Sequence, residues 1–326
     1  MNTTQRVSIS SLLLTSVFLF TLSFSSIAVF AYTSAPRTTT LVYVENPGSN
    51  SVSVISGTKV VKTIGGFSFA GAEMAYAPTE HELFVSNSGG YTVSVINTLT
   101  EKVIKNISGF LSPESAIYVP TNNAVYVVNG GTAEVYVLNV TTLKIEHKIN
   151  VRGMGAFLMF SPITDLLSVD SGSNSIWVIN PVTNKIVKTV TGLNVPGGIA
   201  FDPANNDTYV ANEASGSVSV FNVNYKLLKN ITGFSVPYYF AYNPTNKEMY
   251  LTDNGASIVY VISSSNKVVK AISGLEGPTG IAFNLSNGMM YVSNSISNNV
   301  QTISGYSLGK TIGVGELPYG IIAVAS

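Results

Sequence analysis

Seven copies of one short pattern recur along this chain at intervals of 41 or 42 residues. Each copy has two mostly aromatic or aliphatic residues, then any residue, then Asn or Asp, as in Tyr209-Val210-Ala211-Asn212. A period of this length over so many copies is typical of repeat architectures, in which each copy is one supersecondary unit. The Asn/Asp positions that mark the copies are Asn46, Asn87, Asn129, Asp170, Asn212, Asp253 and Asn294.

One unit, residues 196–232, contains four short apolar runs that are separated by turn residues. Runs rich in Val, Ile, Tyr and Phe between Asp-Pro, Asn-Asn and Gly-Ser predict β-strands joined by hairpin turns. A meander of four strands cannot bury both of its faces alone, so it needs neighbours of the same kind.

The two ends of the repeat region are out of phase with the strands between them. The repeats begin at Leu41–Asn46, which corresponds to a second strand, and finish with Pro318–Val324, which matches a first strand. The last segment can therefore complete the first unit, which closes a ring and removes exposed sheet edges. The sequence predicts an all-β, seven-bladed β-propeller over residues 41–326, with four antiparallel strands per blade.

The pattern PGGIAFDP, TYVAN, SVSVF and KLLKNITGF within residues 196–234 resembles the YVTN-type β-propeller repeats of archaeal and bacterial surface proteins. The resemblance covers residues 41–326 and implies the propeller fold. It implies no particular chemistry, because propellers carry many unrelated functions.

The first 31 residues differ in composition from the rest of the chain. Arg6 is the one charge before Arg37, and Leu12–Ala31 is almost wholly apolar or hydroxylated. Small residues at Val29 and Ala31 favour a signal peptide that is cleaved before Tyr32. An uncleaved membrane anchor is the alternative, because the apolar stretch nears the roughly 20 residues that span a bilayer. Both place the propeller, after a linker at 32–40, outside the cell or on its surface, with membrane contact through this segment alone.

Composition narrows the classes of function. The formal net charge is zero, which gives no field to recruit nucleic acid. Cysteine is absent, which removes disulfides and thiolate chemistry. The two histidines, His81 and His147, fall in different repeats, and no glycine-rich phosphate loop precedes a helix. We therefore expect no cofactor.

The charges that are present separate onto two faces of the predicted ring. The loops between second and third strands, and those between blades, carry Glu73, Glu114, Glu134, Asp170, Glu213, Asp253, Glu276 and Glu316. The opposite face and the outer strands carry Lys59, Lys62, Lys102, Lys105, Lys144, Lys185, Lys188, Lys226, Lys229, Lys267, Lys270 and Lys310. The acidic face can receive a cation or a basic partner. The regular lysines are better explained as protection of outer strands against edge-to-edge pairing.

Side chains at the start of each first strand vary from blade to blade, as binding residues do. Tyr238, Tyr239 and Tyr319 beside Glu73, Glu114 and Glu316 predict an aromatic and acidic funnel at the end of the channel, suited to a sugar, a cation or a peptide. The alternative is that these tyrosines pack between blades. The Asn/Asp markers could form a ring of metal ligands, but seven equivalent copies favour a role in turns.

These observations favour a non-catalytic binding or surface-layer module with a protein or glycan partner. The alternative is a propeller hydrolase or lactonase with a metal in the channel, which could use Glu73, Glu114 and Asp253. Sequons of the form Asn-x-Ser/Thr mark glycosylation candidates at Asn106, Asn139, Asn206, Asn230 and Asn284.

Overall fold

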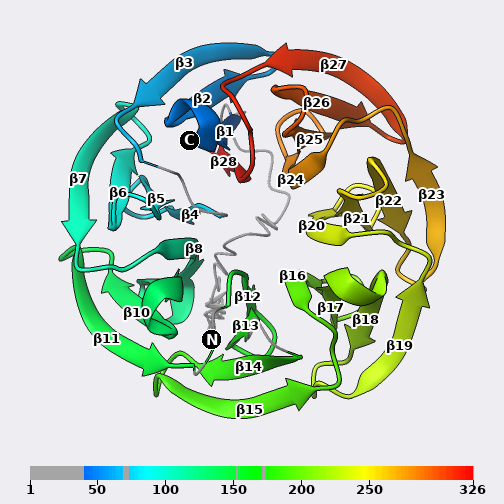
Figure 1. The fold of residues 1–326 in the computed structure, drawn as a ribbon, viewed down its shortest axis with the longest axis horizontal. Helices are drawn as coiled ribbons and strands as arrows, with labels where there is room; N and C mark the ends of the chain where they lie inside the picture. The colour runs from blue at the N-terminus through cyan, green and yellow to red at the C-terminus, as the bar shows by residue number, and fades with distance from the viewer. Residues whose placement is uncertain (1–39, 69–72, 152, 154, 171–173, 326) are drawn as a thin grey trace, which may run out of the picture.

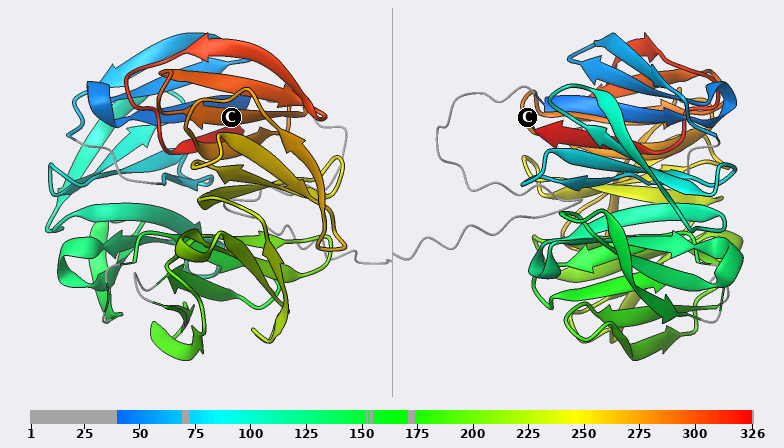
Figure 2. Two further views of the ribbon diagram at one scale, coloured as in Figure 1. Left: turned by 45° about the vertical axis from the view of Figure 1, so that its right-hand side comes forward. Right: turned by 90° about the vertical axis from the view of Figure 1, so that its left-hand side faces the viewer.

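The computed structural model describes residues 40–68, 73–151, 153, 155–170 and 174–325. The expected signal segment at 1–31, and the linker up to residue 39, lie outside the described residues. Within the described part of the chain, seven four-stranded antiparallel sheets surround a central axis (Figure 1). The predicted seven-bladed β-propeller is confirmed, and side views show its blades stacked around the ring (Figure 2).

The blades follow one another in chain order, except that the first takes its inner strand from the C-terminal end. Blade 1 consists of β28 (Ile321–Ala325), β1 (Thr40–Asn46), β2 (Ser51–Ser56) and β3 (Lys59–Gly65). Blade 2 consists of β4 (Ala75–Ala77), β5 (Glu82–Asn87), β6 (Thr92–Asn97) and β7 (Lys102–Ser108). Blade 3 consists of β8 (Pro113–Val119), β9 (Ala124–Asn129), β10 (Glu134–Asn139) and β11 (Lys144–Asn150). Blade 4 consists of β12 (Leu158–Ser161), β13 (Leu166–Asp170), β14 (Ser175–Asn180) and β15 (Lys185–Thr191).

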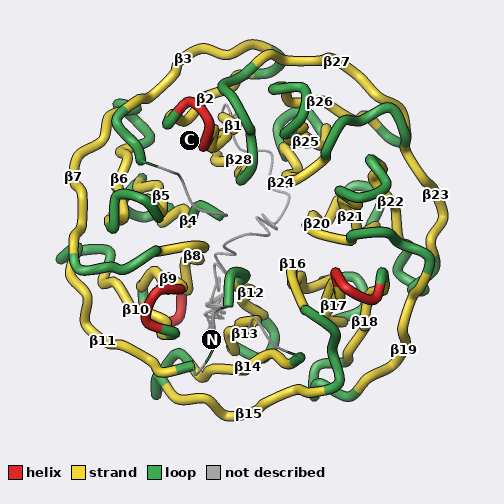
Figure 3. Tube along the Cα trace, in the orientation of Figure 1, coloured by secondary structure: helices red, strands yellow, loops and turns green. Residues whose placement is uncertain are grey.

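The remaining blades have the same order of strands from the axis outwards. Blade 5 consists of β16 (Pro196–Asp202), β17 (Asp207–Asn212), β18 (Ser217–Phe221) and β19 (Leu227–Thr232). Blade 6 consists of β20 (Pro237–Asn243), β21 (Glu248–Asp253), β22 (Ile258–Ile262) and β23 (Val268–Ile272). Blade 7 consists of β24 (Pro278–Asn284), β25 (Met289–Asn294), β26 (Asn299–Ser304) and β27 (Ser307–Gly313). Helix is confined, in the part described, to the single 3₁₀ turns η1 (Pro47–Ser49), η2 (Pro120–Asn122), η3 (Gly130–Thr132) and η4 (Glu213–Ser215) (Figure 3).

The ring is closed by pairing of the two ends of the repeat region. β28 pairs antiparallel with β1 in the register Tyr43 with Ile322 and Leu41 with Val324. This confirms the phase argument from the sequence, because β28 occupies the inner position that β1 leaves empty. No described helix has the length and apolar character needed to cross a membrane.

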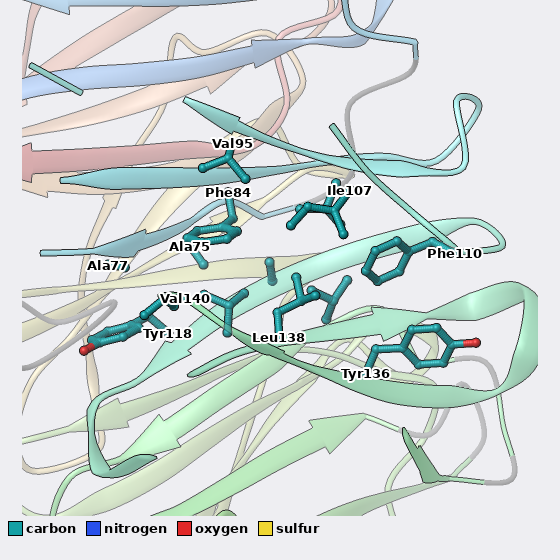
Figure 4. Packing of buried hydrophobic residues seen from close by; sticks show 14 residues of the cluster. Ala75, Ala77, Phe84, Val95, Ile107, Phe110, Tyr118, Tyr136, Leu138 and Val140 are labelled. Carbon is teal, nitrogen blue, oxygen red and sulfur yellow. The ribbon is translucent and has the colours of Figure 1, made fainter. Parts of the chain in front are cut away.

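Apolar side chains fill the spaces between neighbouring blades. Strand side chains alternate between two faces, so each blade contributes to the core on either side of it. Between blades 2 and 3, for example, Phe84, Leu138 and Tyr118 are almost fully buried (Figure 4), and the Phe110 and Tyr136 rings lie 5.3 Å apart. Burying one such side chain contributes about 1.5–3 kcal/mol, so the blade interfaces hold the ring together.

The Asn/Asp markers at the ends of the second strands are buried and bind backbone. Asp253 accepts hydrogen bonds from the Ser235, Val236 and Ala256 amides at 2.7–3.0 Å, and Asn129 accepts one from the Leu111 amide at 2.8 Å. Four markers accept a hydrogen bond from the connection that arrives from the preceding blade: Asn129, Asp170, Asn212 and Asp253. The other three, Asn46, Asn87 and Asn294, donate from their side-chain amides within their own second-to-third hairpin. These contacts agree with a role of the column in turns and connections.

Outer-strand lysines link neighbouring blades. The ammonium groups of Lys62, Lys105, Lys188 and Lys229 each donate to a backbone carbonyl in the outer hairpin of the next blade, at 2.5–3.4 Å. These lysines therefore have a structural task at the rim. The acceptor is a backbone carbonyl, which any residue type can provide. The lysine can therefore recur in several blades although the residue that accepts its hydrogen bond differs from blade to blade.

Candidate functional site

A β-bulge near the start of the inner strands positions the candidate site. In β8, β16, β20 and β24 the register shifts between the proline that begins the strand and the residue three positions later. A bulge of this kind turns side chains out of the ladder. Glu114 in β8 and Tyr238 and Tyr239 in β20 occupy such positions, at the face where the blade-to-blade connections lie. We call this the front face, and the opposite one the back face.

Blade 1 reproduces the same feature just before β28. The Tyr319 amide donates to the Glu45 carbonyl and the Glu45 amide donates to the Gly320 carbonyl, both at 2.9 Å. Tyr319 therefore projects at the same level as Tyr238. Positions that are equivalent in the sequence repeats, such as Tyr238 and Tyr319, therefore lie at the same level of the ring.

Four aromatic rings meet across the front end of the channel, and we call them the aromatic plug: Phe157, Tyr238, Tyr239 and Tyr319. Phe157 of the segment before β12 lies 5.0 Å from Tyr239 and 5.5 Å from Tyr238, with the rings edge to face. Tyr319 lies 6.0 Å from Tyr238, and the two hydroxyls are hydrogen bonded. Such pairs add about 0.5–1.5 kcal/mol to their burial. The tyrosines therefore pack together across the end of the channel where the sequence predicted an aromatic and acidic funnel, because the bulges bring blades 1, 4 and 6 within reach of one another.

Carboxyl groups from four blades surround the plug, and we call them the carboxyl ring: Glu45, Glu73, Glu114 and Glu213. Burial and then the charges of these four groups raise the pKa values of Tyr239 and Tyr319 far above the ordinary value. The ion pair found among the described residues, Lys62 with Glu101 at 3.6 Å, lies on the outer strands. The carboxyl ring thus has no cationic partner among the residues that the structure describes.

Glu45 is fully buried, whereas Glu73 is only partly exposed and its carboxyl lies against Ser115 of blade 3 and Leu158 of blade 4. Glu45 has no exposed surface, and both of its carboxyl oxygens lack a hydrogen-bond partner. Burial, with a contribution from the nearby Glu73, raises the pKa of Glu45 well above its usual range. Burial likewise raises the pKa of Glu73 to about 8, although the Leu158 amide and the Ser115 hydroxyl oppose the shift. Glu73 is therefore largely protonated near neutral pH.

The other two carboxyls are half-buried and closer to solvent. Burial raises the pKa of Glu114, and a hydrogen bond of 2.8 Å from the Ser112 hydroxyl to its carboxylate opposes the shift. Burial also raises the pKa of Glu213. Glu213 reaches over the inner strand because Gly197 has no side chain there: a Cβ at this position would clash with the Glu213 carboxylate.

Of the six predicted binding residues, five converge and one does not. Glu73, Glu114, Tyr238, Tyr239 and Tyr319 belong to the plug or the carboxyl ring, as described above. The Glu316 side chain is exposed, and its backbone binds the β1–β2 turn through the Gly48 amide and the Ser49 hydroxyl. Glu45, Phe157 and Glu213 are the residues of this site that the prediction left out.

An apolar cavity of about 260 Å³ lies along the axis behind the plug. Inner-strand residues such as Ile199, Ala241 and Phe283 line it, and Glu73 and Tyr239 lie at its front end. Its lining reaches Leu285 on the back face, which is 39% exposed, so this end meets solvent.

The described residues do not supply the ligand set of a metal centre: no three His, Cys, Asp or Glu side chains are placed to hold an ion. The sequon asparagines differ in environment. Asn106, Asn206 and Asn230 are exposed, and Asn139 is half-buried. Asn284 is fully buried, with its amide bound to the Thr40 carbonyl, so in the folded ring it is closed to a modifying enzyme.

Comparison with models of known families finds no match, and neither does comparison with curated proteins. Solved structures share the fold. A functionally unknown protein from Desulfotomaculum acetoxidans matches with a TM-score of 0.75 at 17% identity, over 87% of this chain and 98% of that one. Kuenenia stuttgartiensis hydrazine synthase matches with a TM-score of 0.72 at 17% identity, over 81% and 92% of the two chains. Virginiamycin B lyase from Staphylococcus aureus matches with a TM-score of 0.67 at 10% identity, over 77% and 87%. The chain is a seven-bladed β-propeller, and propellers similar to it include enzymes.

Proposed function

We propose that this protein is a non-catalytic binding module of the cell exterior, and that its front face binds a basic segment of a protein partner. The observation that carries the proposal is the carboxyl ring, in which four blades direct carboxyl groups to one aromatic centre without a described cation. A lysine or arginine side chain would offset the unpaired acids and could stack on the partly exposed rings of Tyr238 and Tyr319.

Location outside the cytoplasm is part of the proposal. It is supported by the apolar stretch at Leu12–Ala31 and the small residues before Tyr32. The measurement is the intact mass of the protein from the medium and membrane fractions of its source: a chain beginning at Tyr32 is expected. A full-length chain found in the cytosol would overturn this part.

The binding proposal can be tested with hexalysine as the probe, in calorimetric titrations of the full chain. The half-exposed acids Glu114 and Glu213 are the accessible members of the carboxyl ring, so the double variant Glu114→Gln/Glu213→Gln should weaken hexalysine binding at least tenfold. The double variant Glu134→Gln/Glu276→Gln removes the same charge from the front face outside the ring and is the matched control.

Equal losses in the two double variants would show that hexalysine responds to overall charge and would contradict a defined site. The same samples can be offered ester and lactone substrates with and without EDTA. Turnover that EDTA abolishes would favour the hydrolase alternative instead.

A further inference from the structure

The polarity of the axial cavity changes along its length, which points to a ligand with one apolar end and one polar end. Its wall is formed mostly by apolar side chains of the inner strands, including Ile199, Ala200, Ala241 and Ile281, and the tyrosines Tyr76, Tyr118 and Tyr242 also line it. At the front end the lining changes to the Glu73 carboxyl and Tyr239. Small-molecule sites are commonly apolar cavities with a few convergent polar groups, and this volume suits a ligand of fragment size.

A second acid, Glu45, interacts electrostatically with the Glu73 carboxyl at the polar end of the cavity, although Glu45 does not line the cavity itself. Glu45 lies on the same face of β1 as Tyr43, two residues away, and Tyr43 packs against Leu83, Val85 and Met74 of blade 2. Glu45 therefore faces the junction with blade 2, in which Glu73 lies just before the inner strand β4. Its fully buried carboxyl has no hydrogen-bond partner on either oxygen. Ionising such a carboxyl is costly unless a cation compensates the charge.

An organic cation fits this end better than a metal ion. The described side chains offer no set of three metal-binding groups, but they do offer aromatic faces next to an acid. An ammonium group can be held by one carboxylate and by the faces of aromatic rings.

We propose that the axial cavity binds an apolar molecule that carries a protonated amine, with the amine at Glu73 and the apolar part between the inner strands. Entry is from the back face, where Leu285, Pro244 and Pro78 form the solvent-facing part of the lining. The site shares Glu73 and Tyr239 with the carboxyl ring and the plug, but the plug separates the cavity from the loops that carry Glu114 and Glu213, so the two proposals concern different ligands on opposite sides of the plug.

Binding should be coupled to loss of a proton. The acids and phenols that act on Glu73 and its surroundings are Glu45, Asp170, Glu114, Glu213, Tyr239 and Tyr319. None of these described groups is cationic, and burial raises the pKa of Glu73 to about 8, so Glu73 holds its proton near neutral pH in the empty cavity. An incoming ammonium favours the carboxylate and therefore expels that proton into solution.

The experiment is calorimetric titration of the full chain at pH 7 with hexylamine, 1-hexanol and hexanoate, in two buffers of different ionisation enthalpy. Hexylamine should bind at least tenfold more tightly than 1-hexanol, hexanoate should bind most weakly, and close to one proton should be released per hexylamine. Glu73→Gln should weaken hexylamine at least tenfold, leave 1-hexanol unchanged and abolish proton release.

Two further variants separate the cavity from other effects. Ala241→Leu places extra carbons in the cavity and should weaken both hexylamine and 1-hexanol. Glu276→Gln removes an exposed acid of the front face and should change neither. Equal affinities for the amine and the alcohol, unchanged hexylamine binding in Glu73→Gln, or no binding of any probe would each overturn the proposal. The hexalysine test depends on Glu114 and Glu213, which none of these variants changes, so failure of the two proposals can be told apart.

Discussion

At the scale of single residues, the unusual feature of this propeller is a pair of buried carboxyls, Glu45 and Glu73. A β-propeller needs no charge at either position, and the residues equivalent to Glu45 in other blades include Ala211 and Ser293. Retaining two acids in a desolvated place lowers stability when they ionise. Their presence is therefore better explained by what they bind than by the fold.

The two acids predict a pH dependence of stability. In the folded chain Glu73 has a pKa of about 8, against an ordinary value of 4.5, and the pKa of Glu45 is shifted in the same direction. The folded state then binds more protons than the unfolded state, so the free energy of unfolding should fall as pH rises from about 4.5 to 8. One such group changes it by at most about 1.4 kcal/mol per pH unit.

Glu73→Gln removes the contribution of Glu73 to this dependence and supplies the check. Denaturant unfolding at pH 5 and pH 8 should show a gain in stability for the variant at pH 8 that shrinks towards pH 5. Glu276→Gln, at an exposed site, should follow the unmodified protein at both values. A variant that is equally shifted at both pH values would contradict the assignment of the effect to ionisation of Glu73.

The sequence predicted part of this site because equivalent positions around the ring could be aligned. That alignment brought Tyr238, Tyr239 and Tyr319 to one level, as the structure does. It left out Glu45, although the alternation from Tyr43 already places Glu45 on a buried face. Glu213 could not be found in this way, because its reach to the axis depends on the missing side chain of Gly197 in another strand. Closure of the plug depends on ring orientations that spacing does not determine.

At the scale of elements, the inner strands approach one another so closely that glycine is required at defined points. Gly198 of β16 lies against the Tyr238 carbonyl of β20, and a Cβ there would overlap that oxygen. Gly280 of β24 lies in the same way against the Tyr319 carbonyl, to which its amide donates at 3.0 Å. These contacts fix the height at which the plug forms.

Neighbouring glycines in β16 give a matched pair of substitutions. Gly198→Ala forces backbone to move and should lower the free energy of unfolding by about 1–3 kcal/mol. Gly197→Ala meets only the end of the Glu213 side chain, which can rotate away, so its cost should be smaller. Urea denaturation of the two variants measures both. Equal costs would show that the inner strands can separate more easily than the structure implies.

At the scale of the whole molecule, closure of the ring was the part of the fold that the sequence predicted best. The offset between Leu41–Asn46 and Pro318–Val324 required a strand from each end in one blade, and β1 and β28 pair as expected. The lengths of individual strands were less predictable. The short β4, Ala75–Ala77, follows residues 69–72, which lie outside the described structure.

Removal of residues 317–326 tests how much the ring depends on this pairing. Without β28, β1 becomes an edge strand with unpaired backbone groups, and Ile321 and Ala323 no longer cover Val42 and Val44. We expect a lower melting temperature and larger species in size-exclusion chromatography. A synthetic peptide of residues 317–325 should reverse both changes. A truncated chain that stays monomeric with an unchanged melting temperature would contradict a role for closure in stability.

The pairing of β28 with β1 also has a consequence for synthesis. β28, which completes the first blade, is the last strand of that blade to leave the ribosome. Its pairing with β1 joins the two ends of the repeat region, so this final contact is non-local and forms slowly. Until then the free edge of β1 is open to any strand with the sequence of β28, including that of a second chain. High local concentrations during translation should therefore yield dimers in which two copies exchange their last strands, each ring complete and each made of two chains.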